Sequence, residues 1–164
     1  MKRSQSTTVK TVLEYMVMLN EQSYSGIGRQ LNITPQQFSD WIKKRRPIPQ
    51  ERLQALAAYF GVGEEVLVDT GHFASPLTPL AKVQLHMLLL DQKIAQLEGE
   101  GAEEEEDIAP YRDKKLQLER EREHEIRLGR VAEALQRDHD GRLALLLDQV
   151  LDEAAAKKTE GVES

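Results

Sequence analysis

The stretch from Thr34 to Pro47 (TPQQFSDWIKKRRP) carries residue types at a spacing that suits contact with a DNA duplex. Phe38, Trp41 and Ile42 recur at i, i+3 and i+4, which places apolar side chains on one face of a helix. The other face offers amides, a hydroxyl and a carboxylate, and four consecutive cations follow. Amides can read base edges in the major groove, and cations can hold phosphates. The segment therefore predicts a helix that presents its polar face to DNA.

Five helices before residue 69 are expected to position this face. Apolar residues at helical spacing predict them over residues 8–22, 23–31, 34–46, 50–60 and 63–67. Thr34 is a typical N-cap, Pro35 suits the first helical position, and Gln37 completes a capping box. Asn32 suits the tight turn before Thr34, because asparagine tolerates the left-handed conformation. Gly61 is a natural end for the fourth helix.

Residues 8–68 contain one continuous pattern of apolar positions, turn residues and a helix-ending glycine. Its members are Ile27, Gly28, Leu31, Ile33, Thr34, Phe38, Trp41, Pro47, Leu53, Leu56, Ala57, Phe60, Gly61, Val62, Val66 and Leu67. This pattern resembles the lambda-repressor-like helix-turn-helix family, also called the XRE family, over less than half of the chain. The resemblance implies an all-α, five-helix DNA-binding bundle. The family usually has alanine at the position of Gly28 and often a phosphate-binding glutamine at that of Tyr24.

The resemblance also implies that the helix beginning at Thr34 is the recognition helix. Its base-reading positions are then Pro35, Gln36, Gln37, Ser39, Asp40 and Lys43. Gln36 is the first choice for a direct contact, because a glutamine can pair with both N6 and N7 of adenine. Asp40 has two open interpretations: it accepts from a cytosine amino group, or it only balances Lys43 or Lys44. Phe38 and Trp41 could stack on bases, but their place in the apolar pattern favours burial.

A second set of residues is expected to hold the DNA backbone: Tyr24, Arg29, Lys44, Arg45 and Arg46. Lys43 belongs with these cations as well as with the base-reading set. The alternative for the basic run is a solvated surface without a partner. For Tyr24, the hydroxyl would replace the family's glutamine.

The charge is unevenly distributed along the chain. The net charge of the 164 residues is -6, but residues 1–68 hold nine Lys and Arg against six Asp and Glu, a net of +3. Residues 69–164 hold thirteen against twenty-two, a net of -9. The basic part can meet phosphate, whereas the acidic part would be repelled by it. There is no cysteine, no resemblance to a signal peptide and no apolar run long enough for a membrane span, so a cytoplasmic, nucleoid-associated protein is expected.

The composition divides the chain into four segments. Residues 1–68 form the helix-turn-helix domain, residues 69–79 a linker with prolines and glycine, residues 80–157 an acidic helical region for oligomerisation or partner binding, and residues 158–164 a disordered tail. The third segment begins with a heptad seam about 27 Å long at 1.5 Å per residue. Its members are Leu80, Val83, Met87, Leu90, Ile94 and Leu97. The seam can pair within the chain or between chains.

The rest of the acidic region predicts two further helices. The segment EGEGAEEEED (98–107) is a solvated hinge or, alternatively, a DNA mimic or binding tail. Residues 109–138 form a long charged helix, and residues 142–156 form a third amphipathic one. Pairing of 80–97 with 109–137 would make an antiparallel hairpin, and two such hairpins would make a four-helix dimer.

Enzymatic and metal sites are not expected, and no cofactor is implied. The four histidines are scattered, and only Asp138, His139 and Asp140 resemble a metal cluster, at a turn between helices. Two functions remain. The first is a sequence-specific double-stranded DNA-binding regulator, a dimeric repressor of a phage, plasmid or other mobile element. The alternative is an interaction module (an antitoxin, anti-repressor or adapter) whose acidic helices bind a protein.

Overall fold

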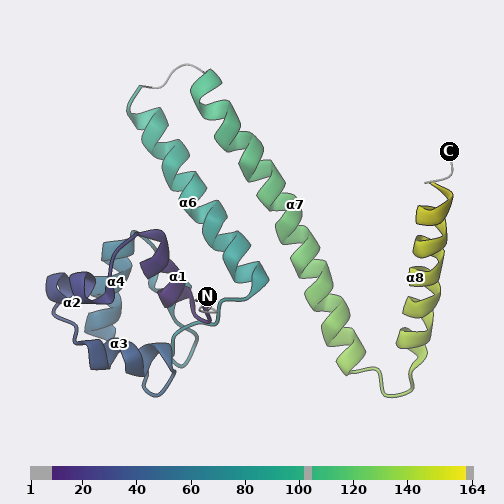
Figure 1. The fold of residues 1–164 in the computed structure, drawn as a ribbon, viewed down its shortest axis with the longest axis horizontal. Coiled ribbons are helices and arrows are strands. Elements are labelled where there is room, and N and C mark those ends of the chain that lie inside the picture. Colours follow the sequence, from purple (N-terminus) through teal and green to yellow (C-terminus); the bar gives the residue numbers. More distant parts are fainter. Residues whose placement is uncertain (1–8, 102–104, 162–164) are drawn as a thin grey trace, which may run out of the picture. The chain divides into compact units, whose positions relative to one another are not determined.

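A computed structural model of the chain describes residues 9–101 and 105–161 and shows an all-α protein over those residues (Figure 1). This confirms the expected fold class. The only strand-like pairings in the described ranges are two isolated bridges, Thr11 with Pro76 and Val68 with Ala74. The helices are α1 (Val12–Leu19), α2 (Tyr24–Leu31), α3 (Pro35–Ile42), α4 (Gln50–Phe60), α5 (Glu64–Leu67), α6 (Pro79–Gly99), α7 (Glu105–Gln136) and α8 (Arg142–Glu160). Among the described residues, none of these helices has the length and apolar character that crossing a membrane requires.

The chain forms two compact units, residues 1–118 and residues 119–164. The boundary falls inside the long helix α7 and differs from the division expected at residue 68. The difference arises because the first unit includes α6 and the first part of α7 as well as α1–α5.

Several local signals of the first five helices are realised in the structure, although α1 is shorter than the expected 8–22 and α3 ends at Ile42, before the expected residue 46. The N-cap of α3 is Thr34, Pro35 is its first residue, and the capping box with Gln37 is formed. Helix α4 has the expected bounds and ends at Gly61 in the left-handed conformation, with φ of 67°. Asn32 adopts the same conformation, with φ of 58°.

The core of the first unit lies among α1–α5. Phe38 and Trp41 are buried as expected, and so is the apolar stripe of α4. Helical spacing of Val9, Val12, Leu13, Met16 and Leu19 predicts the buried face of the first helix. In the structure the buried face of α1 also includes Tyr15 and Val17, whereas Leu19 is exposed.

Residues 69–79, expected to form a linker, are bonded to the bundle. The N–H of Val12 donates to the carbonyl of Ser75 at 3.0 Å, and that of Leu77 donates to Lys10 at 2.8 Å. The N–H of Ile48 donates to the carbonyl of His72, also at 2.8 Å. These bonds satisfy backbone groups at the start of α1 and after α3, so this segment is a fixed part of the first unit.

Helix α6 packs on the same bundle. Leu85 is buried within the core cluster. The Tyr15 hydroxyl is hydrogen-bonded to Nε2 of His86 at 2.5 Å, and Nζ of Lys82 lies 5.5 Å from the centre of the Tyr15 ring. Nε2 of Gln92 donates to the carbonyl of Gly61 at the end of α4. The heptad helix is thus attached to α1 and α4.

Helix α6 and the first part of α7 lie side by side within the first unit (Figure 1). The expected pairing with residues 109–137 is present only as far as Leu118, where this unit ends. Two ion pairs set an antiparallel register, Asp91 with Lys115 at 2.7 Å and Glu98 with Arg112 at 3.3 Å. Three apolar side chains of α6 and α7 are buried outside the main core cluster: Met87, Ile108 and Leu118. In the predicted oligomerisation seam, Met87 is buried and the other five members are half-buried. The seam therefore has a partner in its own chain.

The second unit consists of the end of α7, a short turn and α8. The Asp138 carboxylate accepts hydrogen bonds from the N–H groups of Leu143 (3.2 Å) and Ala144 (3.0 Å) at the start of α8. The bond from Ala144 is the main reason why the pKa of Asp138 is lowered. Helix α8 continues to Glu160, so residues 158–160, expected in a disordered tail, are helical. Residues 1–7, 102–104 and 162–164 of the expected termini and hinge lie outside the described residues.

At Gly28, α2 comes very close to the segment that leads into α3. The Gly28 carbonyl accepts a hydrogen bond from the N–H of Ile33 at 2.8 Å, and a Cβ atom on Gly28 would collide with the carbonyl oxygen of Ile33. This oxygen belongs to the backbone, so it cannot move aside as the end of a flexible side chain could. The alanine that the resembled family usually has would not fit here without a shift of the turn.

Gly28→Ala is expected to lower the free energy of unfolding by about 1–3 kcal/mol, because overpacking against fixed backbone is destabilising. The matched control is Gly129→Ala in α7, where an added Cβ meets no atom within 4 Å. That change should stabilise its helix by roughly 0.5–1 kcal/mol. Urea unfolding followed by circular dichroism and Trp41 fluorescence measures both. A Gly28→Ala protein as stable as the wild type would contradict the close approach.

Candidate nucleic-acid interface

The capping box fixes the start of α3 and, with it, the direction of its polar face. Oγ1 of Thr34 accepts a hydrogen bond from the N–H of Gln37 at 3.2 Å. Oε1 of Gln37 accepts one in return from the N–H of Thr34 at 2.9 Å. Behind this turn, the rings of Phe38 and Trp41 pack edge to face with centroids 5.7 Å apart. The buried aromatic pair thus turns the opposite side of α3 to solvent.

The two glutamines of α3 have different roles. Gln37 uses its side-chain oxygen in the cap, so only its amide NH₂ is left for a base. Gln36 is exposed, and its only hydrogen bond within the described residues is from Nε2 to Oδ1 of Asp40 at 3.1 Å. Pro35 and Lys43 are also exposed, whereas Ser39 is half-buried. Of the residues predicted to read bases, Pro35, Gln36 and Lys43 are therefore the accessible ones.

Asp40 is occupied by structural contacts. Its carboxylate lies 3.9 Å from Nη1 of Arg45 and 4.0 Å from Nε of Arg46. Its backbone carbonyl accepts hydrogen bonds from the N–H groups of the same two residues, at 2.8 and 3.4 Å. The expected partners Lys43 and Lys44 are not the ones that it contacts. Asp40 thereby holds the basic turn against the end of α3.

The basic turn after α3 spreads its cations around the end of the helix. Lys43 is the C-cap, and Lys44 has a φ of 56°, so the chain reverses direction here. All four cations of the turn are exposed. A hollow lined in part by Lys43 and Lys44 also includes Lys10, from the segment before α1. Sequence reasoning missed Lys10, because its neighbourhood with α3 depends on the tertiary fold.

The other two predicted phosphate contacts lie on α2. The Tyr24 ring packs edge to face on Phe38 with centroids 5.3 Å apart. Burial, followed by the nearby Glu14 carboxylate, raises the pKa of Tyr24 to about 12. Its hydroxyl therefore stays neutral and can donate to a phosphate. Arg29 is exposed, and its Nε donates to the Ser25 carbonyl at 3.4 Å.

Arg52 is a cation of this unit with a structural role that the sequence did not reveal. Its Nη1 donates to the carbonyl of Leu31 at 3.1 Å. Leu31 is the last residue of α2, where helix carbonyls lack internal partners and favour a positive charge. Arg52 thus connects α4 to the end of α2, just before the turn to α3.

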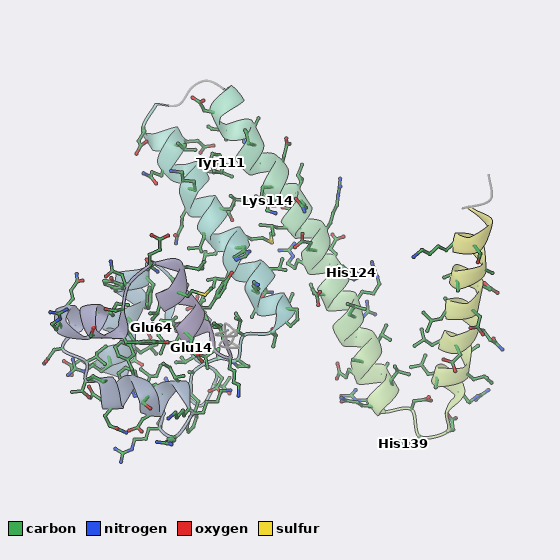
Figure 2. The ribbon with its side chains drawn as sticks, viewed as in Figure 1. Glu14, Glu64, Tyr111, Lys114, His124 and His139 are labelled. Atoms are coloured by element: carbon green, nitrogen blue, oxygen red, sulfur yellow. The ribbon has the colours of Figure 1, made fainter. Side chains whose placement is uncertain are left out.

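No group of His, Asp and Glu that could hold a metal ion occurs within residues 9–101 and 105–161. Figure 2 shows His124 partway along α7 and His139 in the turn before α8. In that turn, the Asp138 and Asp140 carboxylates accept hydrogen bonds from backbone N–H groups of α8. The cluster at 138–140 therefore forms a helix cap.

Comparison with protein-family models, curated proteins and solved structures found no match to this chain.

Substitutions can distinguish the structural role of Thr34 from the surface position of Gln36. Thr34→Ala should lower the free energy of unfolding by about 1 kcal/mol, because it removes the N-cap hydrogen bond. Gln36→Ala should change it by no more than about 0.5 kcal/mol, because Gln36 is exposed and bonded only to Asp40. Denaturant unfolding of both variants measures this difference. Equal losses would mean that Gln36 is a structural residue.

The pKa of Tyr24 predicts a dependence of stability on alkaline pH. Because the folded-state pKa lies above the ordinary 10.0, the contribution of Tyr24 to stability is complete below pH 10.0. It is lost as the pH rises towards about 12. Phenolate absorbance of wild type minus Tyr24→Phe should show this late titration, and Glu14→Gln should move it to lower pH. A Tyr24 that titrates at its ordinary pKa would contradict the burial.

Proposed function

We propose that this protein is a sequence-specific regulator that binds double-stranded DNA through α3. One observation carries the proposal: α3 buries Phe38 and Trp41 and leaves Pro35, Gln36 and Lys43 exposed. An α-helix of this kind fits the width of the major groove, where Gln36 can read an adenine. The exposed basic turn supports it, because cations beside a groove-reading helix can hold the backbone on either side.

The location of the charges supports the same conclusion. The sequence up to residue 68 has a net charge of +3 although the chain as a whole has -6. Lys10 adds a cation beside Lys43 and Lys44. A positive surface on a negative protein favours an orientation in which the basic face meets the DNA.

The regulator is proposed to act as a dimer, of the repressor type found on phages, plasmids or other mobile elements. A single domain with few base contacts discriminates poorly among sites. Two domains on a common axis read two half-sites about one helical turn, roughly 34 Å, apart. The resemblance of residues 8–68 to the lambda-repressor-like family supports this type of regulator.

The test uses full-length protein and a DNA site selected from random duplexes. Combined Lys44→Ala, Arg45→Ala and Arg46→Ala should weaken binding to all sequences and reduce the salt slope of log K by about 3 per bound domain, at roughly 0.9 per lost phosphate contact. Gln36→Ala should instead relax specificity at one base pair, by about 1–3 kcal/mol. Fluorescence anisotropy at several salt concentrations measures both effects.

The matched control removes the same charge from the acidic part, with Lys114→Ala, Arg120→Ala and Lys158→Ala. These residues are exposed, and their loss should leave the salt slope unchanged. If selection enriches no duplex, or if the two triple variants bind DNA equally, α3 is not the DNA-binding element.

The second candidate function, a protein-interaction module, is favoured by the apolar surface of the second unit. Leu145, Leu146 and Val150 on α8 are each more than half exposed. In this case the bundle is a scaffold, and an antitoxin, anti-repressor or adapter activity depends on the acidic helices. Regulation in cells that survives the Lys44, Arg45 and Arg46 triple substitution would favour this candidate over DNA binding.

A further inference from the structure

Helix α8 has an apolar face without a partner among the described residues. Leu146 is 59% exposed and Val150 is 60% exposed, and Leu143 and Leu151 are exposed beside them. At 100° per residue these side chains share one face of the helix, together with Leu147. Most of the stability of a helix in a protein comes from packing of its apolar face, so α8 calls for a surface that buries this face.

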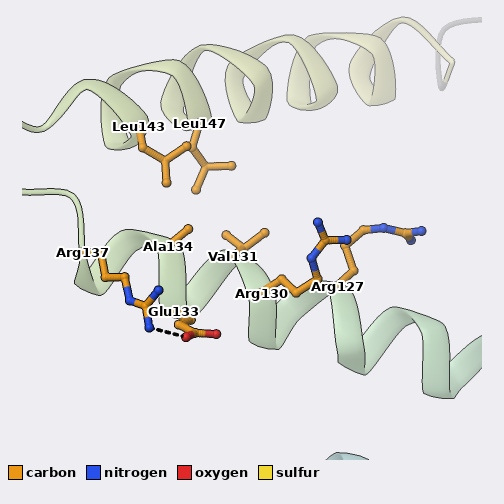
Figure 3. Close-up of a pocket in the computed structure, with 8 residues that line it drawn as sticks. All are labelled: Arg127, Arg130, Val131, Glu133, Ala134, Arg137, Leu143 and Leu147. Carbon is orange, nitrogen blue, oxygen red and sulfur yellow. Dashed lines mark ion pairs between the residues drawn. The ribbon is translucent and has the colours of Figure 1, made fainter.

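A groove between α7 and α8 offers such a surface within the second unit (Figure 3). Its volume is about 710 Å³. Val131 and Ala134 line it from α7, and Leu143 and Leu147 from α8. Figure 3 shows the two leucines pointing towards α7 across an open space. The groove is open enough to admit further side chains between its two walls.

The charges along the groove define what can enter it. Arg127, Arg130 and Arg137 line the α7 wall. Arg137 is paired with Glu133 at 2.8 Å. Within residues 9–101 and 105–161, the guanidinium groups of Arg127 and Arg130 make no hydrogen bond or ion pair. The groove therefore fits an amphipathic helix with an apolar face and acidic flanks.

Helix α8 itself has this chemistry. Residues 143–156 contain no cation, and their charged side chains are Asp148, Asp152 and Glu153. At 100° per residue, Asp148 and Glu153 border the two edges of the apolar face, whereas Asp152 lies on the opposite side. In the part of the chain that the structure describes, these carboxylates have no ion pair. One chain thus carries both a basic apolar groove and an acidic apolar helix, and each lacks its complement.

We propose that the α7–α8 groove of one chain receives α8 of a second copy of the same chain. The two copies are related by a two-fold axis, so each copy inserts its own α8 into the groove of the other. This dimer deepens the function proposed above, because it assigns the pairing surface to α7 and α8 instead of the seam of α6.

The size of the surfaces suits a dimer. Helix α8 is about 28 Å long at 1.5 Å per residue and about 10 Å wide. Strips of that size on α8 and on the facing part of α7 in both copies together cover about 1,100 Å², which is above the roughly 1,000 Å² of a biological interface and in the range of weak, reversible dimers.

The first test compares two neighbouring leucines in the full-length protein. Leu146→Glu places a charge on the proposed interface twice per dimer and should raise the dimer dissociation constant by about 100-fold or more. Leu145→Glu is the matched control, because Leu145 is 62% exposed but lies on the opposite side of α8. Sedimentation velocity measures both variants, and circular dichroism verifies that their helical content is unchanged.

The second test exchanges the charges. Arg127→Glu with Arg130→Glu should weaken the homodimer, and so should Asp148→Lys with Glu153→Lys, because these two carboxylates border the apolar face of α8. A mixture of the two variants should restore a one-to-one heterodimer, because each groove then meets a helix of opposite charge. Closure of α8 onto its own α7, or docking of an unrelated protein, would not produce this restoration.

A monomeric wild-type chain at micromolar concentration, an unchanged dimer in Leu146→Glu, or no restoration in the mixture would overturn the inference. These results are distinguishable from failure of the proposed function. A dimer that selects no DNA leaves the pairing surface intact and removes the regulator, whereas a monomer that selects single half-sites does the reverse.

Discussion

The contact between Gly28 and the Ile33 carbonyl is the constraint on which the exposed polar face of α3 depends. It brings the end of α2 and the start of α3 so close that only hydrogen fits at the Cα of Gly28. The left-handed Asn32 makes the turn between them short. With this crossing fixed, Phe38 reaches the core and the opposite side of α3 must face solvent. The glycine weakens α2 as an isolated helix, so α2 depends on the packing that surrounds it.

The polar residues of α3 divide between structure and recognition. Gln37 closes the capping box, and Asp40 holds the basic turn through its backbone carbonyl and its carboxylate. Gln36 is bonded only to the side chain of Asp40. A base that accepts from Gln36 would therefore replace one exposed hydrogen bond, at small cost in stability. The residue proposed to read a base is thus one whose side chain has a single exposed contact with the rest of the fold.

The predictable parts of the fold are those that depend on residues close together in the sequence. The cap at Thr34, the turn at Asn32 and the end of α4 at Gly61 are local effects of backbone conformation, and the sequence indicated each of them. The same holds for the exposed Gln36 and the buried Phe38, which follow from helical periodicity. The attachment of residues 69–79 was not predictable, because its prolines and glycine also suit a free linker.

Long-range pairings account for the rest of what was missed. Tyr15 is buried because His86 and Lys82 of α6 lie beside it, and no local pattern encodes that approach. Lys10 lies beside the basic turn only because the tertiary fold brings them together. Arg52 of α4 donates to the carbonyl of Leu31 in α2. The heptad pattern of α6 indicated a paired helix correctly, but such a pattern does not specify which chain supplies the partner.

Pairing through α8 would connect the folding of the second unit to the affinity of the regulator for DNA. In a single chain the apolar face of α8 remains in water, and burying it in a second copy would also join two α3 helices. Binding of the second half-site then becomes intramolecular, at an effective concentration in the millimolar range for short connections. The strength of the α8 contact would therefore set the protein concentration at which the DNA is occupied. A change that weakened this contact would release the DNA without altering any residue of α3.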